Sequence, residues 1–159
     1  MPLAALALDT PLGPLVLVSD GEAVVEATFD GTPPPDARPE ADAVLAQATS
    51  ELRAYFDGGA AAFAVPVRPA GTPFQERVWA ALCDIPHGQT TSYGALATRL
   101  GDPQASQAVG AANGQNPIAI LVPCHRVIGA DGSLTGYAGG LERKRSLLAL
   151  ESPQTRLFG

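Results

Sequence analysis

The chain has few of the residues that build metal sites and disulfide frameworks. Among its 159 residues are two cysteines, Cys83 and Cys124, and two histidines, His87 and His125, and none of the four lies within residues 1–68. Their spacing does not match the paired ligands of a zinc site. A reducing compartment also disfavours a structural disulfide. We therefore expect two free cysteines and no bound metal.

The chain also lacks a long apolar run, although 46% of its residues are hydrophobic. No stretch approaches the roughly 18 apolar residues that a membrane-spanning helix needs. Residues 1–4 lack the basic region that begins a signal peptide. With enough apolar residues for a core and neither of these features, the protein is expected in the cytoplasm, away from membranes.

Positive charge is scarce, and the formal net charge is −6. Residues 1–69 contain 3 basic and 10 acidic residues, whereas residues 70–159 contain 7 basic and 6 acidic ones. Proteins that bind nucleic acids usually present a basic surface. The second part is therefore the better candidate for such contacts, and we expect modest non-specific affinity with a shallow salt dependence.

Turn residues divide the first part of the chain into short apolar segments. A helix ending near Asp57 and Gly58 is predicted from the Ala-, Leu- and Gln-rich composition of residues 40–57. The sequence therefore predicts a small sheet with one helix. The predicted strands are residues 3–8, 15–18, 24–29 and 63–68.

Helix signals dominate the second part. Thr72 and Gln75 form a capping box with Pro73 at the first helical position, which predicts a helix that starts there and is broken at residues 84–88. Cys83 falls on the apolar side of this helix, in the core. A basic helix over residues 141–150 carries Arg143, Lys144 and Arg145, for which we expect a solvated face that could also steer a DNA backbone.

Two short helices are predicted between these. Ser92 caps residues 93–100, and Gly101 closes that helix. Asp102 and the following proline start a second helix over residues 104–113. The pair suits a helix-turn-helix and an ordinary helical hairpin equally well. The second helix has no Lys or Arg, so its small residues fit docking in a minor groove better than base reading in the major groove.

The apolar run of residues 118–122, between two prolines, predicts a short buried strand that ends just before Cys124. A thiol at such a point becomes a nucleophile when a positive charge or a histidine lowers its pKa. Most free cysteines are instead small buried hydrophobes. The adjacent His125 alone does not decide between the two, because neighbouring strand side chains point to opposite faces.

The longer sequence around Cys124 favours the nucleophile over the buried hydrophobe. Residues 116–127 closely resemble the active-site segment of the O6-alkylguanine-DNA alkyltransferases. The resemblance extends in order over residues 71–151, and residues 1–68 match weakly. Its other motifs are residues 71–74, 92–94, 108–113 and 136–140.

The resemblance implies an α+β fold. A small N-terminal ribonuclease-H-like sheet domain over residues 1–69 would precede a mostly helical C-terminal domain with a helix-turn-helix over residues 70–159. It implies DNA repair by direct damage reversal, in which a methyl or alkyl group passes from O6 of a flipped-out guanine to Cys124 in a single turnover. O4-alkylthymine is a further possible substrate. The implied partner is double-stranded DNA bound through its minor groove, by a monomer without a cofactor. Some family members bind zinc in the N-terminal part, whose ligands are absent here.

The family's roles transfer residue by residue. His125 and Glu151 match the proton relay that forms the thiolate through a water molecule, Tyr93 matches a proton donor to the leaving base, and Asn116 matches a brace of the site. Tyr137 matches the wall on which the base stacks. The backbones of Cys124, Val127 and Ala138 match groups that bind guanine edges. The DNA-contacting positions are Ser92, Gln107, Ala108, Gly110 and Arg126.

One position departs from the family pattern. Gln107 stands where family members usually place an arginine that fills the gap left by the flipped base. We therefore expect either a shorter polar wedge or weaker extrusion of the base.

Three other functions compete with that of a methyltransferase. Damage-binding proteins of the alkyltransferase-like kind typically lack the active cysteine, so Cys124 argues against that function. A cysteine hydrolase would need an oxyanion-hole pattern, which is missing. The acidic charge disfavours a helix-turn-helix regulator. Intact mass after incubation with methylated DNA separates these possibilities from a methyltransferase.

Overall fold

The computed structural model describes residues 2–58 and 62–152 of the chain. Close contacts divide it into two compact units. The first consists of Met1–Ala70 together with Pro117–Leu121, and the second of Gly71–Asn116 together with Val122–Gly159. The first unit thus includes a short segment from the second half of the chain, which the boundary between residues 69 and 70 did not anticipate. That the two predicted ranges are independent domains stays a prediction.

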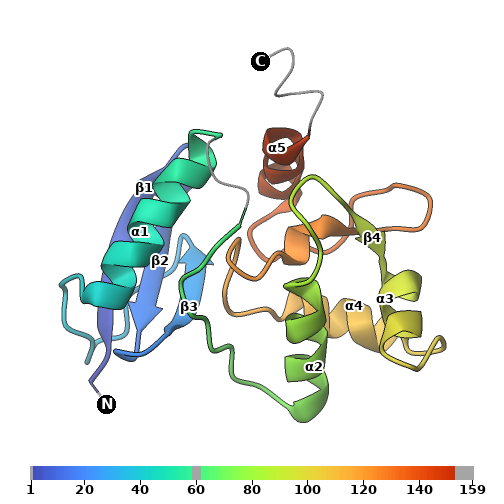
Figure 1. The fold of residues 1–159 in the computed structure, drawn as a ribbon, viewed down its shortest axis with the longest axis horizontal. Helices are drawn as coiled ribbons and strands as arrows, with labels where there is room; N and C mark the ends of the chain where they lie inside the picture. The colour runs from blue at the N-terminus through green and yellow to red at the C-terminus, as the bar shows by residue number, and fades with distance from the viewer. Residues whose placement is uncertain (1, 59–61, 153–159) are drawn as a thin grey trace. The chain divides into compact units, whose positions relative to one another are not determined.

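The first unit is built on a three-stranded antiparallel sheet in the order β1-β2-β3 (Figure 1). Helix α1 (Ala43–Phe56) packs on this sheet, and the Asp42 carboxylate caps it by accepting from the N–H of Leu45 at 2.8 Å. The predicted three strands and helix are confirmed. A strand over residues 63–68 was wrong, because that segment contributes only an isolated bridge to β3. The strands are β1 (Ala4–Thr10), β2 (Gly13–Ser19) and β3 (Val24–Phe29).

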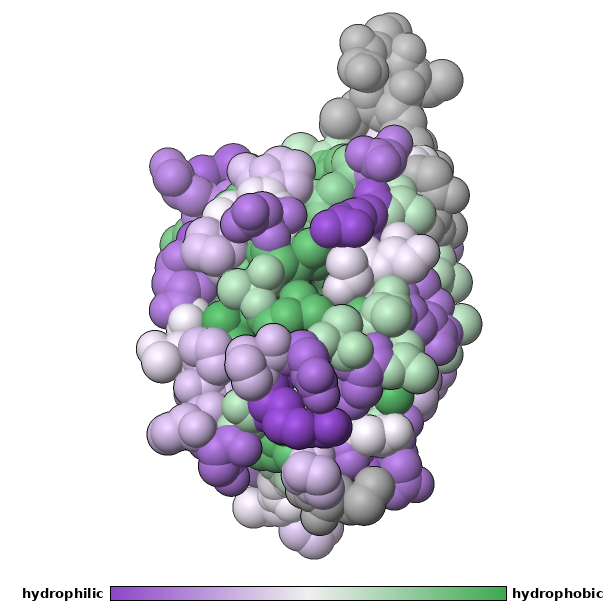
Figure 2. All heavy atoms as spheres, turned by 90° about the vertical axis from the view of Figure 1, so that its left-hand side faces the viewer, coloured by the Kyte–Doolittle hydropathy of each residue, from purple (hydrophilic) through white to green (hydrophobic). Residues whose placement is uncertain are grey.

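The core of this unit lies where the sheet meets α1. Leu15 and Leu17 of β2 and Leu45 and Leu52 of α1 have no exposed surface. Hydrophilic side chains surround a band of hydrophobic ones on the side of the molecule shown in Figure 2. A groove along β1 and α1 is lined by residues of both, including Arg53.

The segment that leads to Cys124 joins the edge of β3. Ala27 donates its N–H to the carbonyl of Pro117 and accepts from the N–H of Ala119, both at 2.9 Å. The predicted strand over residues 118–122 was wrong, because only Ile118 forms a bridge and the chain then turns. Ile120 has φ 71°, a left-handed conformation that is rare for a β-branched residue and cannot continue a strand.

The second unit begins with α2 (Pro73–Leu82), whose predicted capping box between Thr72 and Gln75 is present. Its Trp79 donates Nε1–H to the carbonyl of Ala112 in α4 (Ser106–Gly114) at 2.8 Å, which ties the two helices together. A Cβ atom at Gly71 would come within 2.6 Å of the Trp79 ring, so the start of α2 needs glycine there.

Helix α3 (Tyr93–Arg99) begins at its predicted cap, Ser92, and packs against α4. Gly101 follows with φ 89°, as expected for a glycine that ends a helix. Asp102 was wrong as the start of the next helix. Its carboxylate accepts from the N–H of Gln104 and shapes the turn, and α4 begins four residues after Asp102 without a side-chain cap.

Three short elements and one long helix complete the unit. A 3₁₀ turn, η1 (Cys124–Arg126), leads into β5 (Val127–Ile128), which pairs in parallel with β4 (Thr91–Ser92). Helix α5 (Leu141–Glu151) follows the glycine-rich loop over residues 129–140. Within residues 2–58 and 62–152, no helix has the length and apolar character to cross a membrane.

Candidate active site

Cys124 begins η1, which places it beside the start of α3. The parallel pairing of β4 with β5 aligns Thr91 with Val127 and Ser92 with Ile128. The residue after Ser92 is Tyr93, so this pairing brings α3 and its tyrosine to the chain that follows the cysteine. Neither two-residue strand was predicted, because segments so short carry no periodic signal.

Two asparagines fix the backbone around Cys124. Asn116 donates Nδ2–H to the carbonyl of Val122 at 2.9 Å, and its side chain also hydrogen-bonds Cys124. Asn113 is buried in α4 and donates to the carbonyl of Cys124 at 3.3 Å. The Cys124 carbonyl also accepts from the N–H of Val127. A guanine that donated to this carbonyl would have to share it with Asn113 and Val127 or displace one of them.

The sequence reasoning missed Asn113. A signal for it exists in the pattern of α4, where Val109, Ala112 and Asn113 are the buried residues. These positions lie on one face of a helix, and a polar side chain among apolar ones on such a face needs a specific partner. Here the partner is the peptide group of the reactive cysteine.

The thiol of Cys124 is 6% exposed. Burial raises its pKa to about 11, while Asn116 and the ammonium of Lys144 act in the opposite direction. Four pH units below such a pKa, only about one thiol in 10⁴ is ionised. In the free protein Cys124 is therefore a protonated thiol.

The next residue in the chain has a buried partner of its own. His125 and Glu151 are buried, and Nε2 of His125 lies 2.7 Å from Oε2 of Glu151. A carboxylate can only accept, so Nε2 carries the hydrogen and Nδ1 of the neutral ring is the basic nitrogen. Burial lowers the pKa of His125, with Glu151 opposing, so the ring stays neutral at pH 7 and can accept a proton.

Arg126 completes this cluster. Its Nε and one terminal nitrogen donate to the two oxygens of Glu151 at 2.8 and 3.0 Å, and the other terminal nitrogen donates to the carbonyl of Ile85 at 2.7 Å. The prediction that Arg126 contacts DNA was wrong, because its guanidinium is buried and each of its three nitrogens donates to a group inside the protein. Arg126 thus contacts the same carboxylate as His125.

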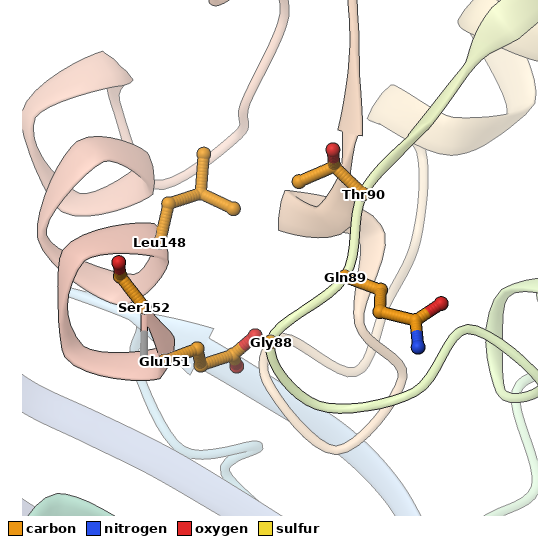
Figure 3. Close-up of a pocket in the computed structure, with 6 residues that line it drawn as sticks. All are labelled: Gly88, Gln89, Thr90, Leu148, Glu151 and Ser152. Carbon is orange, nitrogen blue, oxygen red and sulfur yellow. The ribbon is translucent and has the colours of Figure 1, made fainter. Parts of the chain in front are cut away.

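The far end of the relay borders a small pocket. Figure 3 shows Glu151 extending from α5 toward the backbone at Gly88, with Thr90 and Leu148 on the pocket wall. The carboxylate itself is 2% exposed. Glu151 is therefore not a surface carboxylate, although it is the last residue of α5.

Two further expectations about side-chain exposure were wrong. Cys83 was predicted in the core but is exposed, because it follows the last turn of α2 rather than continuing its buried face. Lys144 was predicted on a solvated face but has no exposed surface, whereas its neighbour Arg145 is exposed. A basic run on a helix does not reveal which of its members turns inward.

The residues expected to contact the base lie in three places. Tyr137 and Ala138 are on the glycine-rich loop, Val127 is in β5, and Tyr93 starts α3. The hydroxyl of Tyr93 lies 2.9 Å from Oγ1 of Thr135 and donates to the Thr135 carbonyl at 3.2 Å. Tyr137 is half-buried, its hydroxyl has no hydrogen-bond partner among the described residues, and burial raises its pKa. Ala138 is exposed, whereas Val127 is buried.

Of the expected DNA-contacting residues outside η1, three lie on α4 and Ser92 lies at the start of α3. Gln107 and Ala108 are exposed there. Gly110 lies against the ring of Tyr93, because a Cβ atom added at Gly110 would stand 3.6 Å from the nearest atom of that ring. The hydroxyl of Ser92 caps α3 by accepting from the N–H of Ala95 at 3.1 Å. No group of three or more Cys, His, Asp or Glu side chains in the described part of the chain is arranged to hold a metal.

Comparison with known families decides the identity. Residues 73–153 match the family described as 6-O-methylguanine DNA methyltransferase, DNA binding domain, and residues 5–69 match its ribonuclease-like domain. The chain belongs to the 6-O-methylguanine DNA methyltransferase family. The residues gathered around Cys124 all lie in the first of these matches.

Relatives in this family align over almost the whole chain. A methylated-DNA–protein-cysteine methyltransferase of Mycobacterium tuberculosis is 49% identical over 91% of this chain and 89% of its own. One from Methanosarcina acetivorans is 48% identical over 90% and 94%. The crystal structure of the M. tuberculosis O6-methylguanine methyltransferase, 45% identical, superposes with a TM-score of 0.86 over 99% of both chains. The M. tuberculosis protein was also crystallised in complex with DNA, with a TM-score of 0.87 to this chain over 98% of it and 99% of that chain.

Proposed function

We propose that this protein repairs DNA by accepting on Cys124 the methyl group of O6-methylguanine. The observation that carries the proposal is the buried chain of contacts from η1 to α5: a cysteine followed directly by a histidine whose far nitrogen is held by Glu151. Cys83, the other cysteine, is exposed and has no such arrangement. Membership of the methyltransferase family supports the same reaction.

The transfer balances with the residues present. The Cys124 proton passes, directly or through a water molecule, to Nδ1 of His125, and Sγ attacks the methyl carbon in line with the departing oxygen. The carbon–oxygen bond breaks and its electrons stay on the guanine, which takes a proton from the Tyr93 hydroxyl. Tyr93 regains a proton from solvent and His125 releases one. The sum converts a thiol and a methylated base into a thioether and guanine.

The thioether explains why the protein acts once. A carbon–sulfur bond of this kind has no leaving group that water could displace at neutral pH, and the site has no second nucleophile assigned to remove the methyl group. The reaction is therefore stoichiometric, with the protein itself as the acceptor. No cofactor takes part in the proposed scheme.

DNA would dock through the helix-turn-helix formed by α3 and α4. The exposed Gln107 and Ala108 on α4, and the absence of Lys and Arg from that helix, fit close approach to a minor groove rather than base reading. The target base would be extruded from the stack. It would then lie between Tyr137 and the cysteine. Action as a monomer in the cytoplasm stays part of this proposal.

Intact-mass measurement after incubation with a duplex containing O6-methylguanine tests the proposal. One added methyl group, mapped by peptide analysis to Cys124, is the expected result. Cys124→Ser should accept nothing yet still bind the duplex. Cys83→Ser is the matched control, because it removes the exposed thiol and should keep full transfer. Methylation of Cys124→Ser would overturn the assignment. So would a loss of transfer in Cys83→Ser, which keeps Cys124.

A further inference from the structure

Lys144 is the one lysine of the chain, and it is buried. It lies on α5 with no exposed surface, and its Nζ donates to the carbonyl of Thr135 at 2.6 Å. Among the residues that the structure describes, no carboxylate forms an ion pair with it. An ammonium in that position has lost its hydration without gaining a counter-charge.

Such burial is costly. An ionised amine removed from water destabilises the fold unless it is paired, and the usual response is a fall in its pKa. Burial does lower the pKa of Lys144, while an electrostatic interaction with Cys124 raises it. The same interaction lowers the pKa of the Cys124 thiol. Helix α5, which carries Lys144, packs against η1, which begins at Cys124. The counter-charge that the ammonium lacks in the free protein therefore appears when Cys124 ionises.

Lys144 also reaches the loop that would hold the base. The Thr135 carbonyl accepts from Nζ of Lys144 and from the hydroxyl of Tyr93. Thr135 precedes Tyr137 by two residues in the same glycine-rich loop. One carbonyl thus joins α5, the start of α3 and the loop that bears the expected base wall.

We propose that Lys144 is a positioning residue of the transfer reaction, whose buried ammonium stabilises the Cys124 thiolate and anchors the base-binding loop through Thr135. This rests on transfer to Cys124 as proposed above. In this scheme Lys144 is protonated when Cys124 ionises, and no proton passes through it. The cost of burying an unpaired cation in the free protein is offset in the reacting state, when sulfur carries the negative charge.

The other groups around the thiol do not supply this charge. Asn116 gives a neutral hydrogen bond, and Tyr137 on the loop is neutral at pH 7 because burial raises its pKa. Arg126 is engaged by Glu151. His125 becomes cationic only by taking the proton. Lys144 also lowers the pKa of His125, but burial and Glu151 are the larger influences there.

The test separates charge from packing. Lys144→Arg keeps the charge, Lys144→Gln keeps a donor for Thr135, and Lys144→Met keeps neither. Arg145→Gln is the matched control, since it removes one positive charge at the next, exposed position of α5. Single-turnover reaction with free O6-benzylguanine, followed by intact mass over a range of pH, avoids any effect on DNA binding.

For the Gln and Met variants we expect at least a tenfold slower reaction at pH 7. The midpoint of their pH–rate profile should rise by about one unit, so that the deficit shrinks at high pH. Arg145→Gln should match the unmodified protein. Lys144→Arg should keep the midpoint. An unchanged midpoint in the Gln and Met variants, whether or not the rate falls, would overturn the charge role.

A second measurement does not depend on the reaction. In a Cys83→Ala background, the rate of alkylation by iodoacetamide, followed by intact mass over a range of pH, reports the ionisation of Cys124 alone. Lys144→Gln and Lys144→Met should raise that titration midpoint, with circular dichroism confirming that each variant is folded. A raised midpoint in a protein that accepts no methyl group would sink the proposed function while sparing the electrostatic link between Lys144 and Cys124. Equal midpoints would sink the inference alone.

Discussion

The guanidinium of Arg126 holds both carboxylate oxygens of Glu151, at 2.8 and 3.0 Å, in a buried two-point contact. The same carboxylate receives Nε2 of His125 at 2.7 Å. Two consecutive residues therefore converge on one acceptor, which is possible because they lie in a 3₁₀ turn rather than in a strand. The arrangement fixes the ring of His125, whose Nδ1 has no hydrogen-bond partner among the described residues.

Removing Arg126 should uncover the cost of this buried carboxylate. Arg126→Met removes two donors from the carboxylate of Glu151, and breaking a buried pair typically costs about 3–5 kcal/mol in the free energy of unfolding. Urea denaturation measures the loss. Because Arg126 also lowers the pKa of His125, NMR titration of that ring should show a higher pKa in the variant. A stability change below about 1 kcal/mol would show that Arg126 does not secure Glu151.

Glu151→Gln should slow methyl transfer and shift its pH dependence upward. The neutral amide still bonds His125 but no longer stabilises the imidazolium that forms when Cys124 loses its proton, so deprotonation needs a higher pH. Single-turnover rates against pH, measured at a temperature where the variant stays folded, test this. If the pH–rate profile is unchanged, Glu151 only supports the structure.

Burial of a neutral His125 should make the fold sensitive to acid. Its folded pKa lies below the unfolded value of 6.5, so the unfolded chain binds the proton first and stability falls as the pH drops below about 6.5. One such group contributes at most about 1.4 kcal/mol per pH unit. His125→Gln keeps a donor for Glu151 without titrating, and its free energy of unfolding should depend less on pH between 7.5 and 5.5. Parallel curves for the two proteins would contradict this.

The sequence predicted most of what local signals encode. Capping residues such as Thr72 and Ser92 marked helix starts correctly, and turn residues separated the strands of the sheet. The apolar run before Cys124 misled, because apolar composition records burial but not the left-handed turn at Ile120. That turn, and the bridge from Ile118 to β3, depend on residues far away in the chain.

The candidate site shows the same division. The resemblance placed His125 and Glu151 in one site, and the structure brings them into contact, yet it left Arg126 outside the protein interior and passed over Asn113. Whether an arginine points inward depends on a carboxylate 25 residues later, and an isolated motif contains no information about that contact. Lys144 is a similar case, since its burial follows from the packing of α5 and not from its neighbours in sequence.

Gln107 stands exposed on α4, where a side chain could enter the space left by an extruded base. Extrusion costs a few kcal/mol of unstacking and unpairing, and a wedge that fills the gap offsets part of that cost. An arginine would cover more of the orphaned base and add charge-assisted contacts. We expect Gln107→Arg to increase the single-turnover rate on duplex O6-methylguanine, and Gln107→Ala to decrease it.

Free O6-benzylguanine is the matched control, because it needs no extrusion. All three proteins should react with it at the same rate, so a difference there would point to damage at the site rather than to the wedge. Gln104, also exposed at the same end of the helix-turn-helix, offers a second control, since Gln104→Arg adds the same charge at a position that precedes α4. If Gln104→Arg accelerates duplex repair as much as Gln107→Arg does, the gain comes from general attraction to the DNA backbone. Equal duplex rates for Gln, Ala and Arg at position 107 would show that this residue does not fill the gap.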